Sequence, residues 1–260
     1  MSEAFANKIA DLDFALGTQA RVMWVSPYLT KLETLQEFGF QEAQSTLVII
    51  GGANFMEPDI KAKLQPFFDQ VLAPLAQELG ITVLDGGTDA GVISMMGQAR
   101  ARLGGDFRLI GVVPRGKAKV PGEEPPDPQI STHSLEPHHT HFFLIPGNSW
   151  GTETPWLTDL ATLLAEHQPS LTVLINGGET SLKDLKANLE ADRLAVVVAG
   201  SGRLADRIAV AMADPQADVD PEIAALVASY HPQGKLISID ISTSLFEVFE
   251  QLKQYFVKAL

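Results

Sequence analysis

Short runs of apolar, mostly β-branched residues recur along the chain. Most of these runs are almost continuously apolar instead of alternating with polar residues, which is typical of strands buried on both faces of a parallel sheet. We predict strands at Leu47–Ile50, Ile81–Leu84, Phe107–Val113, Phe142–Ile145, Leu171–Ile175, Leu194–Val198 and Leu236–Ile239.

Helical patterns lie between these runs. In residues 60–79 the large apolar side chains recur at intervals of three and four residues. Further helices are predicted at Gly91–Leu103, Trp156–Glu166, Leu182–Glu190, Arg203–Met212, Pro221–Tyr230 and Ser244–Leu260. Because strands alternate with helices, we predict an α/β fold with right-handed βαβ units, a doubly wound, mainly parallel sheet and helices on both of its faces.

Two segments do not follow this alternation. We expect residues 1–46 to form an N-terminal helix and an irregular arm packed on the domain that residues 47–260 build. Residues 117–137 contain five prolines and four acidic residues, a composition that resists both helix and sheet. A stretch of this length is unusual for a loop in a compact domain, so it is either a lid or a disordered segment.

Composition narrows the range of partners. The chain has 260 residues, of which 45% are apolar, and this suits one α/β domain. Its net charge of −13 makes duplex nucleic acid and anionic membranes unfavourable partners. No apolar run approaches the roughly 18 residues that a bilayer span requires, and the N-terminus lacks the pattern of a signal peptide. We therefore expect a cytoplasmic protein with a small-molecule partner, and a homo-oligomer remains open.

Four of the predicted strands end in glycine clusters, namely IIGGAN (49–54), LDGGTDAG (84–91), INGGETS (175–181) and VAGSGR (198–203). In an open parallel sheet, ligands bind beyond the carboxyl ends of the strands. Glycine lets the backbone approach a phosphate, and the helix that follows offers unpaired N–H groups and a positive dipole end. The clusters predict a phosphate-binding edge, although they match neither a P-loop nor the dinucleotide motif GxGxxG.

A few side chains near these clusters could contribute. Arg203 would begin a helix, where a cation opposes the helix dipole unless an anion is also bound, and Arg115 follows another strand. Each of them could instead be a solvated surface arginine. Ser201 is expected to be the N-cap of the helix that follows. His139 and His141 are predicted to share one strand face, but without cysteine or a third ligand near them we predict no metal site and assign them to ligand binding or to structure.

Several motifs together resemble the SLOG superfamily, and most closely its LSDAT branch, the ligand-sensing domain that also forms the N-terminal region of melastatin-type TRP channels. They are GGA (51–53), GGTDAGV (86–92), GVVPRG (111–116), HTHFFL (139–144), NGGETSLKDL (176–185) and AGSGRLADRIA (199–209). The resemblance covers roughly residues 46–212, and the chain looks like a stand-alone prokaryotic member because no channel segment is seen in it.

The resemblance implies a Rossmann-like fold and a nucleotide-derived ligand, with ADP-ribose-like molecules as candidates and no cofactor. Together with the glycine clusters it implies ligand contacts from Gly52, Ala53, Gly86, Gly87, Thr88, Arg115, His141, Gly177, Gly178, Gly200, Ser201, Gly202 and Arg203.

Cytokinin-activating phosphoribohydrolases are more distant relatives within this superfamily, with the signature Pro-Gly-Gly-x-Gly-Thr-x-x-Glu. The stretch that begins at Asn176 departs from it at four positions, and Asp184 replaces the glutamate. A carboxylate that is one methylene shorter can fall out of reach of its target. We therefore expect a ligand-binding sensor. The alternative is a hydrolase that cleaves the N-glycosidic bond of a nucleotide or ADP-ribose-type substrate, with Asp184 or Glu179 as the carboxylate.

Overall fold

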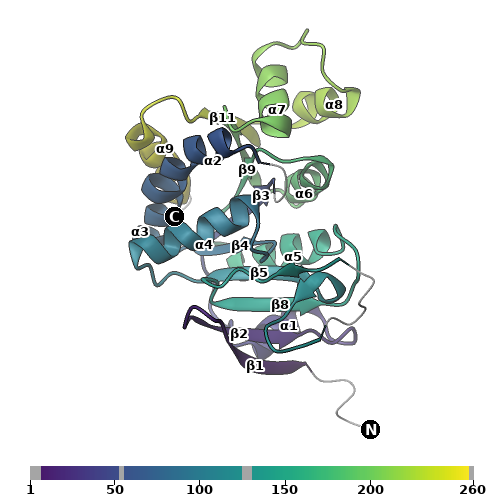
Figure 1. Ribbon diagram of the computed structural model, residues 1–260. Coiled ribbons are helices and arrows are strands. Elements are labelled where there is room, and N and C mark those ends of the chain that lie inside the picture. The colour runs from purple at the N-terminus through teal and green to yellow at the C-terminus, as the bar shows by residue number, and fades with distance from the viewer. Residues whose placement is uncertain (1–6, 53–55, 125–130, 258–260) are drawn as a thin grey trace.

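One large sheet runs through the molecule in the computed structural model, which describes residues 7–52, 56–124 and 131–257 (Figure 1). Its strands are β1 (Lys8–Asp13), β2 (Gln19–Trp24), β3 (Thr46–Gly51), β4 (Thr82–Asp85), β5 (Leu109–Pro114), β8 (His141–Ile145), β9 (Ser170–Ile175), β10 (Leu194–Ala199) and β11 (Leu236–Asp240). Their order is β1-β2-β8-β5-β4-β3-β9-β10-β11, and only the β1–β2 pair is antiparallel. The predicted parallel α/β sheet is confirmed.

The predicted helices are also present, with ends shifted by a few residues. They are α2 (Pro58–Phe67), α3 (Ala73–Leu79), α4 (Gly91–Leu103), α5 (Thr154–Ala165), α6 (Glu179–Glu190), α7 (Arg203–Ala213), α8 (Pro221–Tyr230) and α9 (Leu245–Val257). A π-helical turn, η2 (Phe68–Leu72), joins α2 to α3, so the predicted helix over 60–79 is one continuous helical segment. In the described part of the chain, no helix combines the length and the apolar character needed to cross a membrane.

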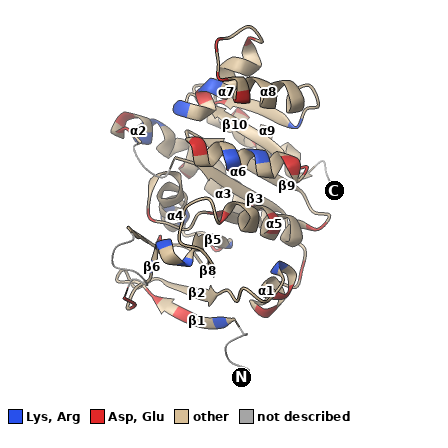
Figure 2. Cartoon of the chain, turned by 90° about the vertical axis from the view of Figure 1, so that its right-hand side faces the viewer, with Lys and Arg blue, Asp and Glu red and all other residues tan. Residues whose placement is uncertain are grey.

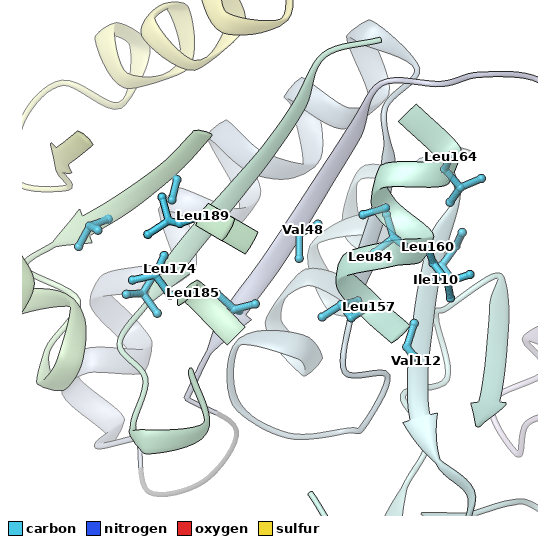
Figure 3. Packing of buried hydrophobic residues seen from close by; sticks show 14 of the residues in the cluster. Val48, Leu84, Ile110, Val112, Leu157, Leu160, Leu164, Leu174, Leu185 and Leu189 are labelled. Carbon is cyan, nitrogen blue, oxygen red and sulfur yellow. The ribbon is translucent and has the colours of Figure 1, made fainter. Parts of the chain in front are cut away.

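Both faces of the sheet are buried, which is why its strands read as continuous apolar runs. Successive side chains of a strand point to opposite faces. In β3, Val48 and Ile50 join the cluster that packs against α5 to α8, whereas Leu47 and Ile49 join the cluster against α2 to α4 and α9. Figure 3 shows how leucines of α5 and α6 cover strand residues on the first of these faces.

The N-terminal segment differs from its prediction. A hairpin of β1 and β2 replaces the expected irregular arm, and β2 extends the main sheet by pairing with β8 in parallel. The segment does contain a helix, α1 (Lys31–Glu37), whose N-cap is Thr30. The sequence did not predict the hairpin because β1 is an edge strand, so four of its six residues are exposed and its apolar run is short. Residues 1–6 lie outside the described part.

The proline-rich segment is anchored at both of its ends. After the short 3₁₀ turn η3 (Arg115–Lys117), β6 (Ala118–Lys119) pairs with β7 (His133–Ser134), and Val120 and Leu135 are buried. Residues 125–130 lie outside the described part, so the choice between a lid and a disordered segment stays open.

The direction of the chain through the sheet changes next to β3. From β3 the chain moves through β4 and β5 to β8, and then returns to the other side of β3 with β9, β10 and β11. The switch point therefore lies between β3 and β9, which is where open α/β sheets bind ligands. The strands β4, β3, β9 and β10 are neighbours and parallel, so their four glycine clusters lie at one edge of the sheet, as predicted.

Candidate functional site

The turns after β9 and β10 are fixed to each other by two buried side chains. The backbone N–H of Asn176 donates to Ser201 Oγ at 2.8 Å, and Asn176 Nδ2 donates to the carbonyl of Ser201 at 2.7 Å. The Ser201 hydroxyl donates in turn to the carbonyl of Val198 at 2.6 Å. The predicted N-cap role of Ser201 is wrong, because Gly202 is the N-cap of α7 and has no side chain to offer. Because its hydroxyl bonds to Asn176 and Val198, Ser201 holds the turn after β10 against the turn after β9 at the carboxyl edge of the sheet.

Backbone packing explains the glycines at the switch point. A Cβ on Gly51 would lie 2.1 Å from the carbonyl oxygen of Ile175, and one on Gly52 would lie 2.6 Å from Asn176 Oδ1. These two glycines let β3 and the turn after β9 approach each other closely. Ala53, which was also predicted to contact the ligand, lies outside the described residues.

Gly200 bonds within the protein through both of its polar backbone groups. Its N–H donates to Asp206 Oδ1 at 2.7 Å, and its carbonyl accepts from Lys63 Nζ at 3.0 Å. Asp206 therefore closes this turn. Gly200 supplies a positive φ of 81° to the turn and has no N–H left for a ligand.

The start of α7 keeps unused hydrogen-bond donors. The N–H groups of Leu204 and Ala205 donate to carbonyls of the turn after β9, whereas those of Gly202 and Arg203 have no partner in the described ranges. Arg203 has a φ of 51°, a region that non-glycine residues rarely adopt. Its exposed guanidinium forms no hydrogen bond or ion pair within 7–52, 56–124 and 131–257.

A cavity of about 460 Å³ opens beside these donors, between α6, α7 and α8. A Cβ on Gly178 would lie 3.0 Å from Arg203 Nη2, so the turn after β9 and the start of α7 face each other here. Acidic and basic residues are mixed along α6 and α7 (Figure 2). The cavity is lined by Gly177, Gly178, Glu179, Leu182, Lys183, Arg203, Leu204, Arg207, Asp220, Glu222 and Ile223. Of the predicted contacts, the structure thus brings together Gly177, Gly178 and Arg203, with Gly202 adjacent in the chain.

The turn after β4 is organised differently. The N–H of Gly87 donates to Asp85 Oδ1 at 2.8 Å, and a Cβ on Gly87 would lie 2.8 Å from the Cα of Gly111. Gly87 therefore allows two backbones to pack, and its N–H is already used. Gly86 is half-buried, and a Cβ there would meet only the end of a flexible isoleucine side chain at 3.0 Å.

Thr88 is buried by the segment around β7. It forms an antiparallel bridge with Leu135, and the neighbouring Asp89 donates its N–H to the carbonyl of Ser134 at 2.8 Å. Thr88 is thus buried where the turn after β4 meets the segment around β7.

A buried network of charged groups lies behind this turn. His139 Nε2 contacts Asp85 Oδ1 at 2.8 Å, and His139 Nδ1 contacts Glu136 Oε2 at 2.8 Å. Glu136 also bonds to His138 Nδ1 at 2.7 Å. Burial alone lowers the pKa of His139, but Asp85 and Glu136 outweigh burial and raise the pKa to about 9. The imidazolium ties β4 to the segment before β8, a role for Glu136 that the sequence did not reveal.

His141 does not reach the glycine edge. It begins β8, and its ring lies 5.2 Å from Phe38 and 5.1 Å from Phe40, on the face covered by α1 and α5. His139 precedes the strand and stacks on Phe142 of the other face, so the predicted shared face of the two histidines is wrong. Burial and the nearby arginines lower the pKa of His141 to about 4.

Arg115 follows β5 and lines a different, smaller cavity of about 170 Å³, together with Trp24 and Glu123. The structure therefore does not bring Arg115 to the cavity that Arg203 lines. No group of three or more His, Asp or Glu is arranged for a metal among the residues that the structure describes, and the predicted absence of metal stays a prediction.

Two carboxyl groups with raised pKa values lie near the start of α5 and on α6. Thr154 donates to Asp184 Oδ1, and burial raises the pKa of Asp184 to about 6. Glu153 accepts the N–H of Gly151, and burial together with the charge of Asp184 raises its pKa to about 7. Glu179, the other carboxylate predicted for catalysis, is exposed. The sequence missed Glu153 because it precedes a helix like any ordinary N-terminal acid.

Comparison with known proteins gives consistent relatives. The family model described as "SLOG in TRPM, prokaryote" matches residues 44–247. Transient receptor potential cation channel subfamily M member 2 from Mus musculus is 25% identical over 254 residues, which cover 84% of this chain and 17% of the channel. The Rattus norvegicus channel is 26% identical over 218 residues, which cover 71% of this chain and 14% of the channel. The chain therefore spans less than a fifth of the length of these relatives.

A solved structure is similar in fold. The X-ray structure of TM1055, a structural genomics target, superposes with a TM-score of 0.50 at 14% identity, covering 80% of this chain and 99% of that one. At this identity the likeness concerns the fold alone, and it agrees with the doubly wound α/β architecture.

Proposed function

The chain belongs to the prokaryotic SLOG family related to TRPM channels, and on that premise we propose that it is a ligand sensor that binds a nucleotide-derived, phosphate-bearing small molecule, with ADP-ribose-like molecules as candidates. The observation that carries the proposal is the unpaired guanidinium of Arg203 beside the free N–H groups at the start of α7.

The electrostatics at this point favour an anion. A helix N-terminus carries a partial positive charge, and Arg203 adds a full one in the same place. Those two charges repel each other in the free protein, and a phosphate between them would turn repulsion into two attractions. Gly202 and Arg203 adopt positive φ values of 95° and 51°, and their two successive N–H groups have no partner among the described residues.

The adjoining cavity provides room for the rest of the molecule. Its volume of about 460 Å³ lies in the usual range for small-molecule sites. Lys183 and Arg207 supply further positive charge in its wall, and Glu179 and Asp220 could accept hydrogen bonds from sugar hydroxyls. The proposed ligand thus has a phosphate at the turn and a polar body in the cavity.

Thermal unfolding with a ligand panel tests this proposal. Protein freed of any co-purified molecule is heated with nucleoside mono-, di- and triphosphates, cyclic nucleotides, nicotinamide dinucleotides and ADP-ribose. We expect at least one of them to raise the Tm and Arg203→Ala to reduce its affinity by about tenfold or more, because a charge-assisted contact is lost. Arg102→Ala, which removes an exposed arginine on the other face of the sheet, is the matched control and should leave the affinity unchanged. If no member of the panel binds, or if both variants bind as the wild type does, the proposal fails.

A second candidate function, hydrolysis of the N-glycosidic bond of such a ligand, is favoured by the two carboxyl groups of Asp184 and Glu153. Their raised pKa values mean that a proton is available near neutral pH, as a general acid requires. Long incubation followed by chromatography separates the two functions. Release of free base that is lost in Asp184→Asn and retained in Glu179→Gln would support the hydrolase, whereas intact ligand supports the sensor.

A further inference from the structure

Three basic side chains share one face of the sheet at the amino ends of β5 and β8. Arg21 of β2 is directly opposite His141 of β8, and His141 is opposite Ile110 of β5. Arg108 precedes Ile110 by two residues, so it points to the same face. Register alone therefore places Arg21, His141 and Arg108 side by side. The glycine turns follow the opposite, carboxyl ends of the strands.

Two aromatic rings from the connection between α1 and β3 support this group. The ring of His141 lies 5.2 Å from Phe38 and 5.1 Å from Phe40. The guanidinium of Arg21 lies 5.5 Å from the ring of Phe38, and that of Arg108 lies 5.3 Å from the ring of Phe40. The rings thus separate the cluster from the core and leave the two guanidinium groups on either side of the imidazole.

Asp11 of β1 is the carboxylate that the register places directly opposite Arg21, but no hydrogen bond or ion pair joins the two side chains in the described structure. The chain has 32 acidic residues against 19 Lys and Arg, yet neither Arg21 nor Arg108 forms an ion pair within the part of the chain that is described. The charges that act on His141 are those of Arg108, Arg21 and Arg100, and all three disfavour its protonation. Arg100 itself donates to the carbonyls of Phe107 and His138.

The hydrogen bonds define which nitrogen of His141 is available. Thr140 Oγ1 donates its proton to the carbonyl of Leu109 at 3.0 Å and accepts the N–H of Leu109 at 3.0 Å. His141 Nδ1 lies 2.9 Å from the same oxygen, and it donates in that contact when the hydroxyl proton bonds to Leu109. In this tautomer the proton of the neutral ring is on Nδ1, and Nε2 is left to be protonated when an anion arrives.

We propose that Arg21, Arg108 and His141 form a second anion site, separate from the glycine edge, which binds a phosphoryl group and takes up a proton at His141 Nε2. Two guanidinium groups on either side of one imidazole match a phosphoryl group, which has several acceptor oxygens to share among them. Cation–π contacts account for each arginine singly. Neither arginine forms an ion pair among the described residues, so both guanidinium groups keep donors for an anion.

The test follows the ring protons of His141 by NMR in the full-length protein. Sulfate serves as the first probe because it remains a dianion over the whole pH range, and His141→Gln identifies the signal. We expect sulfate to shift the signal saturably at millimolar concentrations and to raise the pKa of His141. Inorganic phosphate and nucleoside monophosphates should compete with it, and their order of affinity distinguishes free phosphate from a nucleotide as the natural source.

Variants then locate the site. Arg108→Gln and Arg21→Gln should each weaken sulfate binding by about tenfold or more, because each removes a charge-assisted contact. Arg203→Gln should leave the response of His141 unchanged. The two sites are therefore tested independently: either one can fail while the other is confirmed. A response equal in wild type, Arg21→Gln and Arg108→Gln would reveal general screening by salt and overturn the proposal. Absence of a saturable response, or its loss in Arg203→Gln, would overturn it as well.

Discussion

Asn176 and Ser201 show how single residues shape the candidate site without reaching a ligand. Asn176 adopts a φ of 60°, which asparagine tolerates better than most residues, and its side chain and N–H both bond to Ser201. Because these groups are buried, each one needs its partner. The two residues therefore fix the position of the N–H groups at the start of α7.

Replacing the buried hydroxyl should cost stability. Ser201→Ala leaves the N–H of Asn176 and the carbonyl of Val198 without their partner, and we expect the free energy of unfolding to fall by about 1–3 kcal/mol. Urea unfolding followed by circular dichroism measures the change. Ser229→Ala, at an exposed position of α8, is the control and should remain within about 0.5 kcal/mol of the wild type. Equal stability of the two variants would refute the bridging role of Ser201.

The buried imidazolium of His139 should make stability depend on pH. Its folded pKa of about 9 lies above the ordinary value of 6.5, so protonation stabilises the native state. This contribution is complete below pH 6.5 and is lost as the pH rises towards 9 and above. A shift of this size corresponds to a contribution on the order of 3 kcal/mol.

Urea unfolding at a series of pH values between 6 and 10 tests this directly. We expect the wild type to lose stability across the alkaline part of this range and His139→Gln to show a flatter profile, although its overall stability is lower. His167→Gln, at an exposed position, should keep the wild-type profile. Parallel profiles for wild type and His139→Gln would contradict the assignment of the charge.

At the scale of single elements, the turns after β4 and β9 use their glycines for different purposes. Gly87 adopts a φ of 66° and packs against the backbone of Gly111, whereas Gly178 has an extended backbone and faces only Arg203. The same Gly-Gly pattern thus serves backbone packing in one turn and leaves space beside a charged side chain in the other.

Substitutions in the β4 turn should separate packing from function. Gly87→Ala places a Cβ 2.8 Å from the Cα of Gly111 at a positive φ, and we expect a loss of about 2–4 kcal/mol in unfolding free energy. Gly86→Ala meets only a flexible isoleucine end and should cost less than about 1 kcal/mol. Denaturant titration of both variants compares them, and comparable losses would show that the close approach of the two backbones is not the reason for the glycine.

The strand β2 should behave as a core element although it belongs to the N-terminal segment. Met23 is fully buried in the same cluster as Phe38 and Phe143. We expect Met23→Ala to lower the unfolding free energy by about 2–5 kcal/mol. Ile9→Ala on the edge strand β1, where the side chain is 37% exposed, should have a much smaller effect in the same unfolding experiment. A minor effect of Met23→Ala would mean that the hairpin adds little to the stability of the sheet.

At the scale of the whole molecule, ligand binding and stability are linked. A ligand that binds only the native state stabilises it by RT ln(1 + [L]/Kd), which is about 2.7 kcal/mol at a hundredfold excess over Kd. A domain of this size should then gain several degrees in Tm, from roughly 2–4 °C per kcal/mol in somewhat smaller domains. The gain should increase with the logarithm of ligand concentration. A Tm that stays constant while the ligand concentration rises a hundredfold above Kd would show that the molecule does not bind the native state in preference to the unfolded state.

The sequence by itself determined the elements, the sheet class and the gathering of the glycine clusters. Strands buried on both faces read as continuous apolar runs, and parallel strands bring their carboxyl ends to one edge. This signal fades where exposed residues interrupt the apolar run, as at four of six positions in β1 and two of six in β2, and the sequence therefore predicted an irregular arm there.

Only the tertiary structure decided what each residue of the candidate site does. A glycine in the sequence does not reveal whether it leaves space for a phosphate or for another backbone. Only the spatial neighbours of Gly87 and Gly178 distinguish these two roles. The separation of His139 from His141 likewise depends on where β8 begins, because His139 precedes the strand and the alternation of strand side chains does not extend to it. Such assignments depend on contacts between segments distant in the chain, which local patterns do not encode.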